Sequence, residues 1–289
     1  MGRIIPLLLL AGVAAAAAAV ITVISNEEKK PDYIEDPDSP QEGNGGKKAL
    51  SERVYVNYDS FKNPLDLELI KNIITKHFEE AGISTAADKC VVEHDESFEY
   101  PEFRYFEEPC RIVLTNPDAL YWCQQIYQLS HELTHFVTHE HNSDHDLAIK
   151  WIEETVCEAV SLYCFDVFAD KWEETPLGKR SPEYKKSLLD YRDGRIEERR
   201  NNAVEPLLSK ANADELKLID AESESVRGHR GAEVLELYGI LAPDMLKGLA
   251  AYRDYADGLY LRSEEYKAAF PGNKAVEYLC HISDRIKAE

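Results

Sequence analysis

The chain has 289 residues, which is enough for one or two domains with a sizeable core. Hydrophobic residues make up 44% and charged residues 30%, a balance that is typical of globular rather than disordered proteins. The net charge of −21 repels phosphate backbones, so nucleic acid is not an expected partner.

An almost unbroken apolar run opens the chain, from Ile4 to Ile24. As a helix rising about 1.5 Å per residue, it can span a hydrocarbon core of about 30 Å. Ala17 and Ala19 also offer the small-x-small pattern of a signal-peptide cleavage site. Residues 1–25 are therefore predicted to be a single-pass membrane anchor or a cleaved signal peptide. In both cases we expect the bulk of the protein outside the cytoplasm, either anchored or secreted.

Residues 26–51 are rich in Pro, Gly, Asp and Glu and contain few apolar side chains. Such a segment cannot bury enough apolar surface to become ordered, so it is predicted to be a flexible linker. The folded part is expected to begin at residue 52.

Three short segments are rich in β-branched and aromatic residues and predict strands, at 53–58, 89–93 and 110–115. Between the first two, Asn63-Pro64 starts a helix with apolar residues at helical spacing, and Gly82 ends it. The acidic, aromatic segment 95–108 is predicted to be a loop or hairpin.

The six cysteines contain no C-x-x-C pair, so a cysteine zinc site has no support. Cys157 and Cys164 lie on one predicted helix and are expected to be small buried residues. Cys90 and Cys110 lie in two predicted strands, where an oxidising compartment would allow them to pair.

The sequence Leu129-Ser-His-Glu-Leu-Thr-His-Phe136 contains the pattern His-Glu-x-x-His. It lies on a helix that is predicted to start at Asn116-Pro117-Asp118. His131 and His135 are four residues apart and share one helix face, so they can bind one metal ion. Glu132 then lies beside the metal, where a carboxylate can take a proton from water.

A catalytic zinc ion needs three protein ligands and an open position for water, and two residues compete for the third place. Glu154 follows His135 after 18 intervening residues, on the next predicted helix. The other candidate is His141, in the string HELTHFVTHEH.

The first choice makes the chain resemble the gluzincin metallopeptidases, whose pattern is His-Glu-x-x-His, a spacer and a Glu on a following antiparallel helix. The spacer and the run Trp-Ile-x-Glu look most like their aminopeptidase branch. The resemblance implies that His131, His135 and Glu154 bind zinc and that Glu132 is the general base. Glu158 is similar to the acidic residue that holds a ligand histidine in some gluzincins.

The second choice resembles the metzincins, which place a third histidine at the position of His141. Metzincins need a glycine at the position of Thr138, where the helix turns sharply. They also place a methionine-containing turn under the metal, whereas Met245 lies in a predicted helix. Both departures favour Glu154.

The gluzincin resemblance covers only residues 130–159. The aminopeptidase branch has a Gly-x-Met-Glu-Asn substrate strand, and no such run occurs near residues 110–120. The chain is also much shorter than members of that branch. The metal site and the reaction type therefore carry over, and aminopeptidase specificity does not.

The remaining sequence is almost entirely helical by pattern. Residues 159–172 continue the helix of Glu154, and Ser181-Pro182-Glu183 opens another. Further helices centre on residues 214–220, 232–241, 244–255 and 274–286. The predicted class is α+β: a zincin-like catalytic domain at 52–172, with a small sheet and the metal helix, and a helical subdomain at 173–289 that completes a cleft.

A peptidase of this type also needs a donor for the tetrahedral oxyanion, usually a Tyr or His of the helical half. The candidates are Tyr184, Tyr191, His229 and Tyr238, and none is preferred. The sequence thus predicts a membrane-associated peptidase that binds one Zn²⁺ and acts on a peptide or protein. The alternative is a non-catalytic scaffold or interaction protein with a vestigial zinc site.

Overall fold

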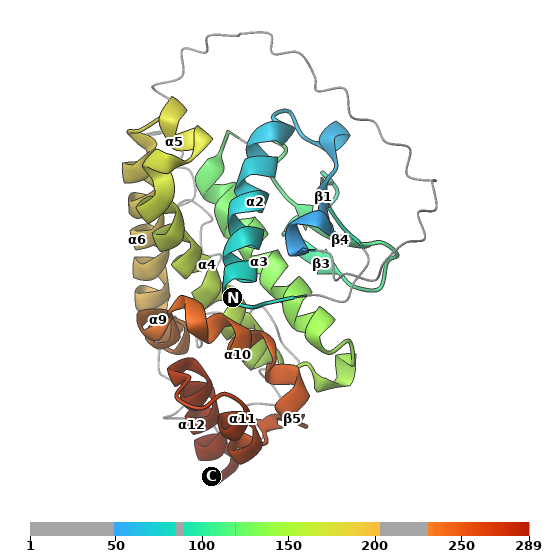
Figure 1. The fold of residues 1–289 in the computed structure, drawn as a ribbon, viewed down its shortest axis with the longest axis vertical. Coiled ribbons are helices and arrows are strands. Elements are labelled where there is room, and N and C mark those ends of the chain that lie inside the picture. Colours follow the sequence, from blue (N-terminus) through green and yellow to red (C-terminus); the bar gives the residue numbers. More distant parts are fainter. Residues whose placement is uncertain (1–48, 85–88, 119, 203–230, 289) are drawn as a thin grey trace, which may run out of the picture. The chain divides into compact units, whose positions relative to one another are not determined.

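The computed structural model describes residues 49–84, 89–118, 120–202 and 231–288, all within one compact unit. The predicted membrane segment, nearly all of the predicted linker and the predicted helix at 214–220 lie outside these ranges. Within them, no helix has the length and hydropathy that a membrane span requires. The architecture is mixed α and β, with one four-stranded sheet and many helices (Figure 1).

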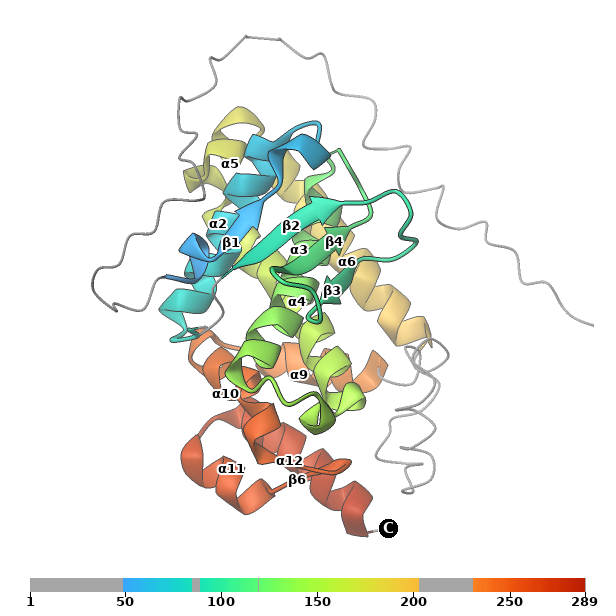
Figure 2. The ribbon, with the colours of Figure 1, turned by 90° about the vertical axis from the view of Figure 1, so that its right-hand side faces the viewer.

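The four-stranded sheet has the order β1-β2-β4-β3. Strands β1 (Val54–Val56), β2 (Cys90–His94) and β4 (Cys110–Leu114) are parallel, and the edge strand β3 (Glu102–Arg104) runs antiparallel to β4 (Figure 2). The three predicted strands are confirmed, and β3 lies in the segment predicted to be a loop or hairpin. Its sequence, Glu-Phe-Arg, has one apolar residue between two charged ones and so contains no apolar run that would predict a strand.

Parallel pairing places Cys90 directly opposite Cys110 on neighbouring strands, and both thiols are free in this structure. The predicted buried positions of Cys157 and Cys164 are confirmed, at 0% and 1% exposure.

Helix α2 (Pro64–Glu80) packs against the sheet and α3 through a buried apolar face. As predicted, Pro64 lies in its first turn, and Gly82, with φ of 79°, follows its last. The Asn63 side chain makes no cap hydrogen bond and instead donates to the Asp118 carboxylate at 3.0 Å.

Two long helices, α3 (Trp122–His141) and α4 (Lys150–Lys171), are packed against each other in the core. Helix α3 begins at Trp122, so the predicted start at Asn116–Asp118 is wrong. The side chains of Asn116 and Asp118 accept hydrogen bonds from the amides two residues ahead, of Asp118 at 2.9 Å and Leu120 at 3.1 Å. These local turns compete with the helix for the same backbone groups.

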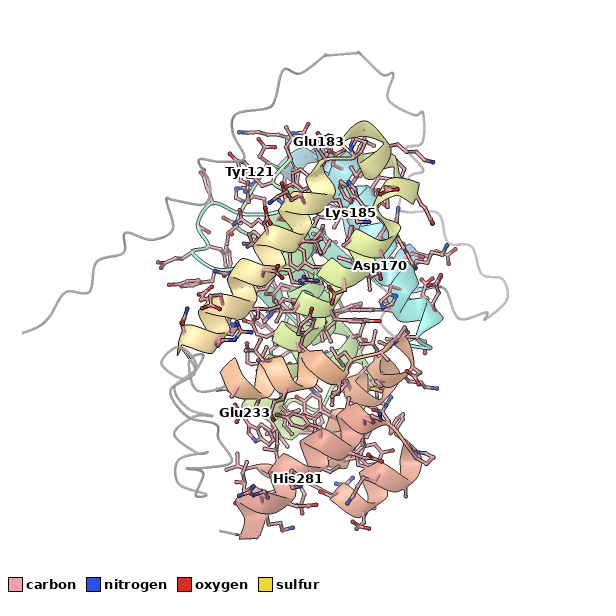
Figure 3. All side chains as sticks on the ribbon, turned by 90° about the vertical axis from the view of Figure 1, so that its left-hand side faces the viewer. Tyr121, Asp170, Glu183, Lys185, Glu233 and His281 are labelled. Atoms are coloured by element: carbon pink, nitrogen blue, oxygen red, sulfur yellow. The ribbon has the colours of Figure 1, made fainter. Side chains whose placement is uncertain are left out.

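Two of the later helices, α6 (Tyr184–Asn202) and α9 (Gly231–Ile240), pack directly on α4. The structure contains α5 (Pro176–Arg180), α6 (Tyr184–Asn202), α9 (Gly231–Ile240), α10 (Leu246–Ala250), α11 (Ser263–Ala269) and α12 (Lys274–Ala288). Figure 3 shows α6 beside α4, with Asp170 near the end of α4 and Lys185 near the start of α6. The predicted helix at 244–255 is divided into α10 and two short 3-10 turns, of which η6 (Tyr252–Tyr255) becomes important below. After η6 comes a hairpin of two antiparallel strands of two residues each, β5 (Ala256–Asp257) and β6 (Tyr260–Leu261).

His77 on α2 predicts a pH dependence of stability. Its imidazole is buried, and its ring centroid lies 5.6 Å from that of Tyr163. Burial, and then the charge of Lys171, lower its pKa from 6.5, against an opposing effect of Glu80. Between the folded pKa and about pH 6.5, His77 is therefore protonated in the unfolded chain and neutral in the folded chain. Stability from this source is full above about pH 6.5 and is lost as the pH falls towards the folded pKa, by at most about 1.4 kcal/mol per pH unit.

Urea unfolding between about pH 5 and 8 measures this slope, which His77→Phe should reduce around pH 6.5. The matched control is His281→Gln, on the exposed face of α12 (Figure 3), which should leave the slope as it is. An equal slope in the wild type and the His77→Phe variant would contradict the assignment.

Candidate metal centre

The site lies between α3 and α4, and the contacts between the two helices show that their chains run in opposite directions. His135, late in α3, contacts Glu153 early in α4, whereas Tyr127, two turns earlier in α3, contacts Glu158 later in α4. The two helices are therefore antiparallel along the site. The helical period explains the rest: His131 and His135 lie one turn apart on the face that meets α4.

Three predicted metal ligands converge here. The Nε2 atoms of His131 and His135 are 3.3 Å apart. The Glu154 carboxylate faces both, with Oε2 at 3.6 Å from Nε2 of His131 and Oε1 at 3.6 Å from Nε2 of His135. The three side chains thus point their ligand atoms at one common space.

The separation of the two imidazole nitrogens is that expected around a zinc ion. Tetrahedral bonds of about 2.0 to 2.1 Å place neighbouring ligand atoms about 3.3 to 3.4 Å apart. The two Nε2 atoms are 3.3 Å apart, and each lies 3.6 Å from a different oxygen of Glu154. Two imidazoles and one carboxylate are also a donor set of catalytic zinc sites, so the residues present fit the metal.

His135 is oriented by the residue before Glu154. Its Nδ1 lies 2.9 Å from Oε1 of Glu153, which is 8% exposed. A carboxylate can only accept, so Nδ1 donates, and in the neutral imidazole Nε2 keeps a lone pair for a metal. Burial would raise the pKa of Glu153, but hydrogen bonding and charge from His135, with Arg253 and Tyr252, lower it to about 2.

Glu158, the residue expected to hold a ligand histidine, has other partners. Arg199 of α6 donates to its Oε1 at 2.6 Å, and the Tyr127 hydroxyl donates to its Oε2. Burial would raise the pKa of Glu158, but the positive charge of Arg199 and then of His131 lowers it. The carboxylate that holds His135 is therefore Glu153 and not Glu158. In the sequence, the sign of such a residue is a second glutamate on a mostly buried helix.

Cys157 lies at the same site. Single ligand atoms of His131, His135 and Cys157 all lie within 4.8 Å of one another. Burial raises the pKa of the Cys157 thiol to about 12, although His135 opposes that shift. For His135, burial disfavours the charged form, but Cys157, Glu153 and Glu154 together raise its pKa well above 6.5.

His141, the competing third ligand, is directed elsewhere. Helix α3 continues through Thr138 to His141 without the turn that a metzincin site needs. Six residues along a helix is a rotation of about 240°, so His141 leaves the face of His135. Its Nδ1 lies 2.9 Å from Oδ2 of Asp254.

The proposed general base, Glu132, is 3% exposed and directly follows His131 on α3.

The residues considered as oxyanion donors have the following contacts. The Tyr184 hydroxyl accepts from the Cys123 amide at 3.3 Å, Tyr191 packs on Tyr127 and Phe165, and Tyr238 donates to Asp166 at 2.7 Å. His229 lies outside the described residues.

The structure thus brings His131, His135 and Glu154 together, with Cys157 beside them, and directs His141 to another partner. Sequence reasoning missed the second layer around Glu153, since its partners Tyr252 and Arg253 lie about 100 residues away with no local pattern. In comparisons with known proteins, no family model, curated protein or solved structure matches this chain.

Proposed function

We propose that this chain is a zinc-dependent peptidase in which His131, His135 and Glu154 bind the metal and Glu132 is the general base. The observation that supports this proposal is the ligand triangle of His131, His135 and Glu154, in which the two Nε2 atoms are 3.3 Å apart and each lies 3.6 Å from a different oxygen of Glu154. Its dimensions suit zinc, and its three protein ligands leave one tetrahedral position for water.

The chemistry divides between the metal and the protein. A zinc ion held by His131, His135 and Glu154 would polarise a scissile carbonyl and lower the pKa of its bound water towards neutrality. Glu132 accepts the proton of the attacking water and passes it to the leaving amine. Glu153 holds His135 in the tautomer that binds metal.

An extended peptide is the proposed substrate. β3 is an edge strand of the described sheet and packs on α3, where Phe103 contacts Phe136 and His139 with ring centroids 5.8 and 5.7 Å apart. Its open side can pair with an extended chain through backbone hydrogen bonds. The apolar run at residues 4–24 would keep the peptidase at a membrane or export it.

The first test is metal content together with hydrolysis. Purified full-length protein, dialysed against metal-free buffer, should retain close to one zinc per chain and cleave members of an unbiased peptide library. A zinc chelator should stop cleavage, and added Zn²⁺ should restore it. Protein that folds, binds no zinc and cleaves nothing would show that the histidine pattern is accidental.

A structural zinc site is the second candidate, and the position of Cys157 favours it. If the thiolate joined the two histidines and Glu154, four protein ligands would close the site. The Co²⁺-substituted protein distinguishes the two, because a cobalt–thiolate bond gives an intense near-ultraviolet band. We expect no such band, because the proposed catalytic site takes only the two histidines and Glu154 as protein ligands. A band that disappears in Cys157→Ser would establish the closed site.

A further inference from the structure

Arg253 is a buried residue of the C-terminal segment whose guanidinium contacts the metal centre. Its side chain is 3% exposed. Nη2 donates to both oxygens of Glu153, at 2.8 and 2.7 Å, and Nε donates to Oε2 at 3.2 Å. Burying a guanidinium is unfavourable unless it is fully paired, so this contact fixes the plane of the Glu153 carboxylate.

Tyr252 completes the set of donors. Its hydroxyl is fully buried and donates to Oε2 of Glu153. Oε2 is therefore held by Tyr252 and Arg253, while Oε1 is turned to Nδ1 of His135 at 2.9 Å. A carboxylate held on both oxygens cannot rotate away from the imidazole that it orients.

The turn η6 that carries these residues is also tied to the end of α3. Nη1 of Arg253 donates to the Asn142 carbonyl at 3.5 Å, and the Asn142 side chain donates to Asp254 at 3.0 Å. His141 contacts the same Asp254 carboxylate. One short turn is thus attached to α3 and, through Glu153, to α4.

We propose that Arg253 and Tyr252 are positioning residues that hold His135, through Glu153, in the orientation and tautomer that a zinc ion requires. This inference rests on the proposed function, because it takes Nε2 of His135 as a metal ligand. It makes the C-terminal segment part of the metal centre, more than 100 residues after the histidine motif. Partners of this kind typically contribute 10- to 100-fold to metal affinity.

Arg199 offers a matched control. It is also a buried arginine paired with a carboxylate of α4, with 2.6 Å between Nη2 and Oε1 of Glu158. Glu158 accepts hydrogen bonds from Arg199 and Tyr127 and interacts with His131 through charge, whereas Glu153 accepts a hydrogen bond from His135 of the site. Arg199→Lys should therefore lower stability as Arg253→Lys does, without the same effect on the metal.

The experiment measures the affinity of the full-length chain for Zn²⁺ alone, by competition with a chromophoric chelator. Arg253→Lys should weaken binding roughly 10- to 100-fold, since a lysine keeps the charge but loses the fork that grips both oxygens. Tyr252→Phe keeps the ring and should cause a smaller loss in the same direction. Arg199→Lys should stay within about threefold of the wild type. The visible spectrum of bound Co²⁺ should change in Arg253→Lys and not in Arg199→Lys.

A double-mutant cycle isolates the route through Glu153. In the Glu153→Gln background, Arg253→Lys should cause little further loss of affinity, because the carboxylate that it holds is already gone. Equal losses in Arg253→Lys and Arg199→Lys, or additive losses in the cycle, would overturn the inference. If Arg253→Lys does not fold, a zinc affinity in Tyr252→Phe equal to that of the wild type would likewise overturn the inference. A wild type that binds no zinc would instead overturn the proposed function, and this inference with it.

Discussion

Replacing Glu132 with Gln is expected to lower peptide hydrolysis by about 10²- to 10⁴-fold while leaving zinc bound, the range that general acid–base catalysis contributes. Glutamine has nearly the same shape as glutamate but cannot accept the proton of the attacking water. Glu132 is only 3% exposed and directly follows His131 on α3. Because it is not one of the three residues that form the ligand triangle, zinc content should not change.

The measurement is turnover of a peptide found in the library screen, with zinc content determined on the same samples. The matched control is Glu140→Gln, two turns further along α3, where the carboxylate lies 3.3 Å from His139 rather than at the triangle. That variant should keep wild-type turnover. Full turnover in Glu132→Gln would rule out this residue as the base, and loss of zinc there would make it a ligand.

The ligand triangle could be predicted from the sequence because its geometry is mostly local. Four residues of helix determine that His131 and His135 share a face. The spacing to Glu154 needs only a short connection and a second antiparallel helix, which α3 and α4 provide. The strands were predictable for a similar reason, since β1, β2 and β4 each carry β-branched or other apolar residues in a short run.

The surroundings of the triangle could not be predicted in this way. Which of two glutamates on α4 meets His135 depends on the rotation of that helix about its axis, and Glu153 and Glu158 are both buried. Packing decides, and Arg253 and Arg199 each pair with one of them. These arginines come from segments whose sequences carry no sign of the partner. A buried charge needs its counter-charge, but sequence does not say where in the chain it lies.

Replacing Glu154 with Ala is expected to reduce zinc affinity by more than the 10- to 100-fold that loss of an orienting partner causes. The reason is that two histidines alone leave the ion without its only charged protein ligand in the triangle. Zinc should then no longer remain after dialysis. Zinc-dependent stabilisation should also disappear, which for the wild type amounts to about 4 kcal/mol when free zinc exceeds the dissociation constant a thousandfold.

Metal analysis and thermal unfolding with and without zinc measure both effects. Two controls separate the alternatives: His141→Ala and Cys157→Ser should each keep one zinc per chain. His141 is paired with Asp254, and Cys157 is not among the three ligands of the proposed catalytic site, so neither variant should lose the ion. Loss of zinc only in His141→Ala would show that the third metal ligand is His141 and not Glu154. Loss in Cys157→Ser as well as in Glu154→Ala would mean a closed site, and would change the function from peptidase to zinc-stabilised scaffold.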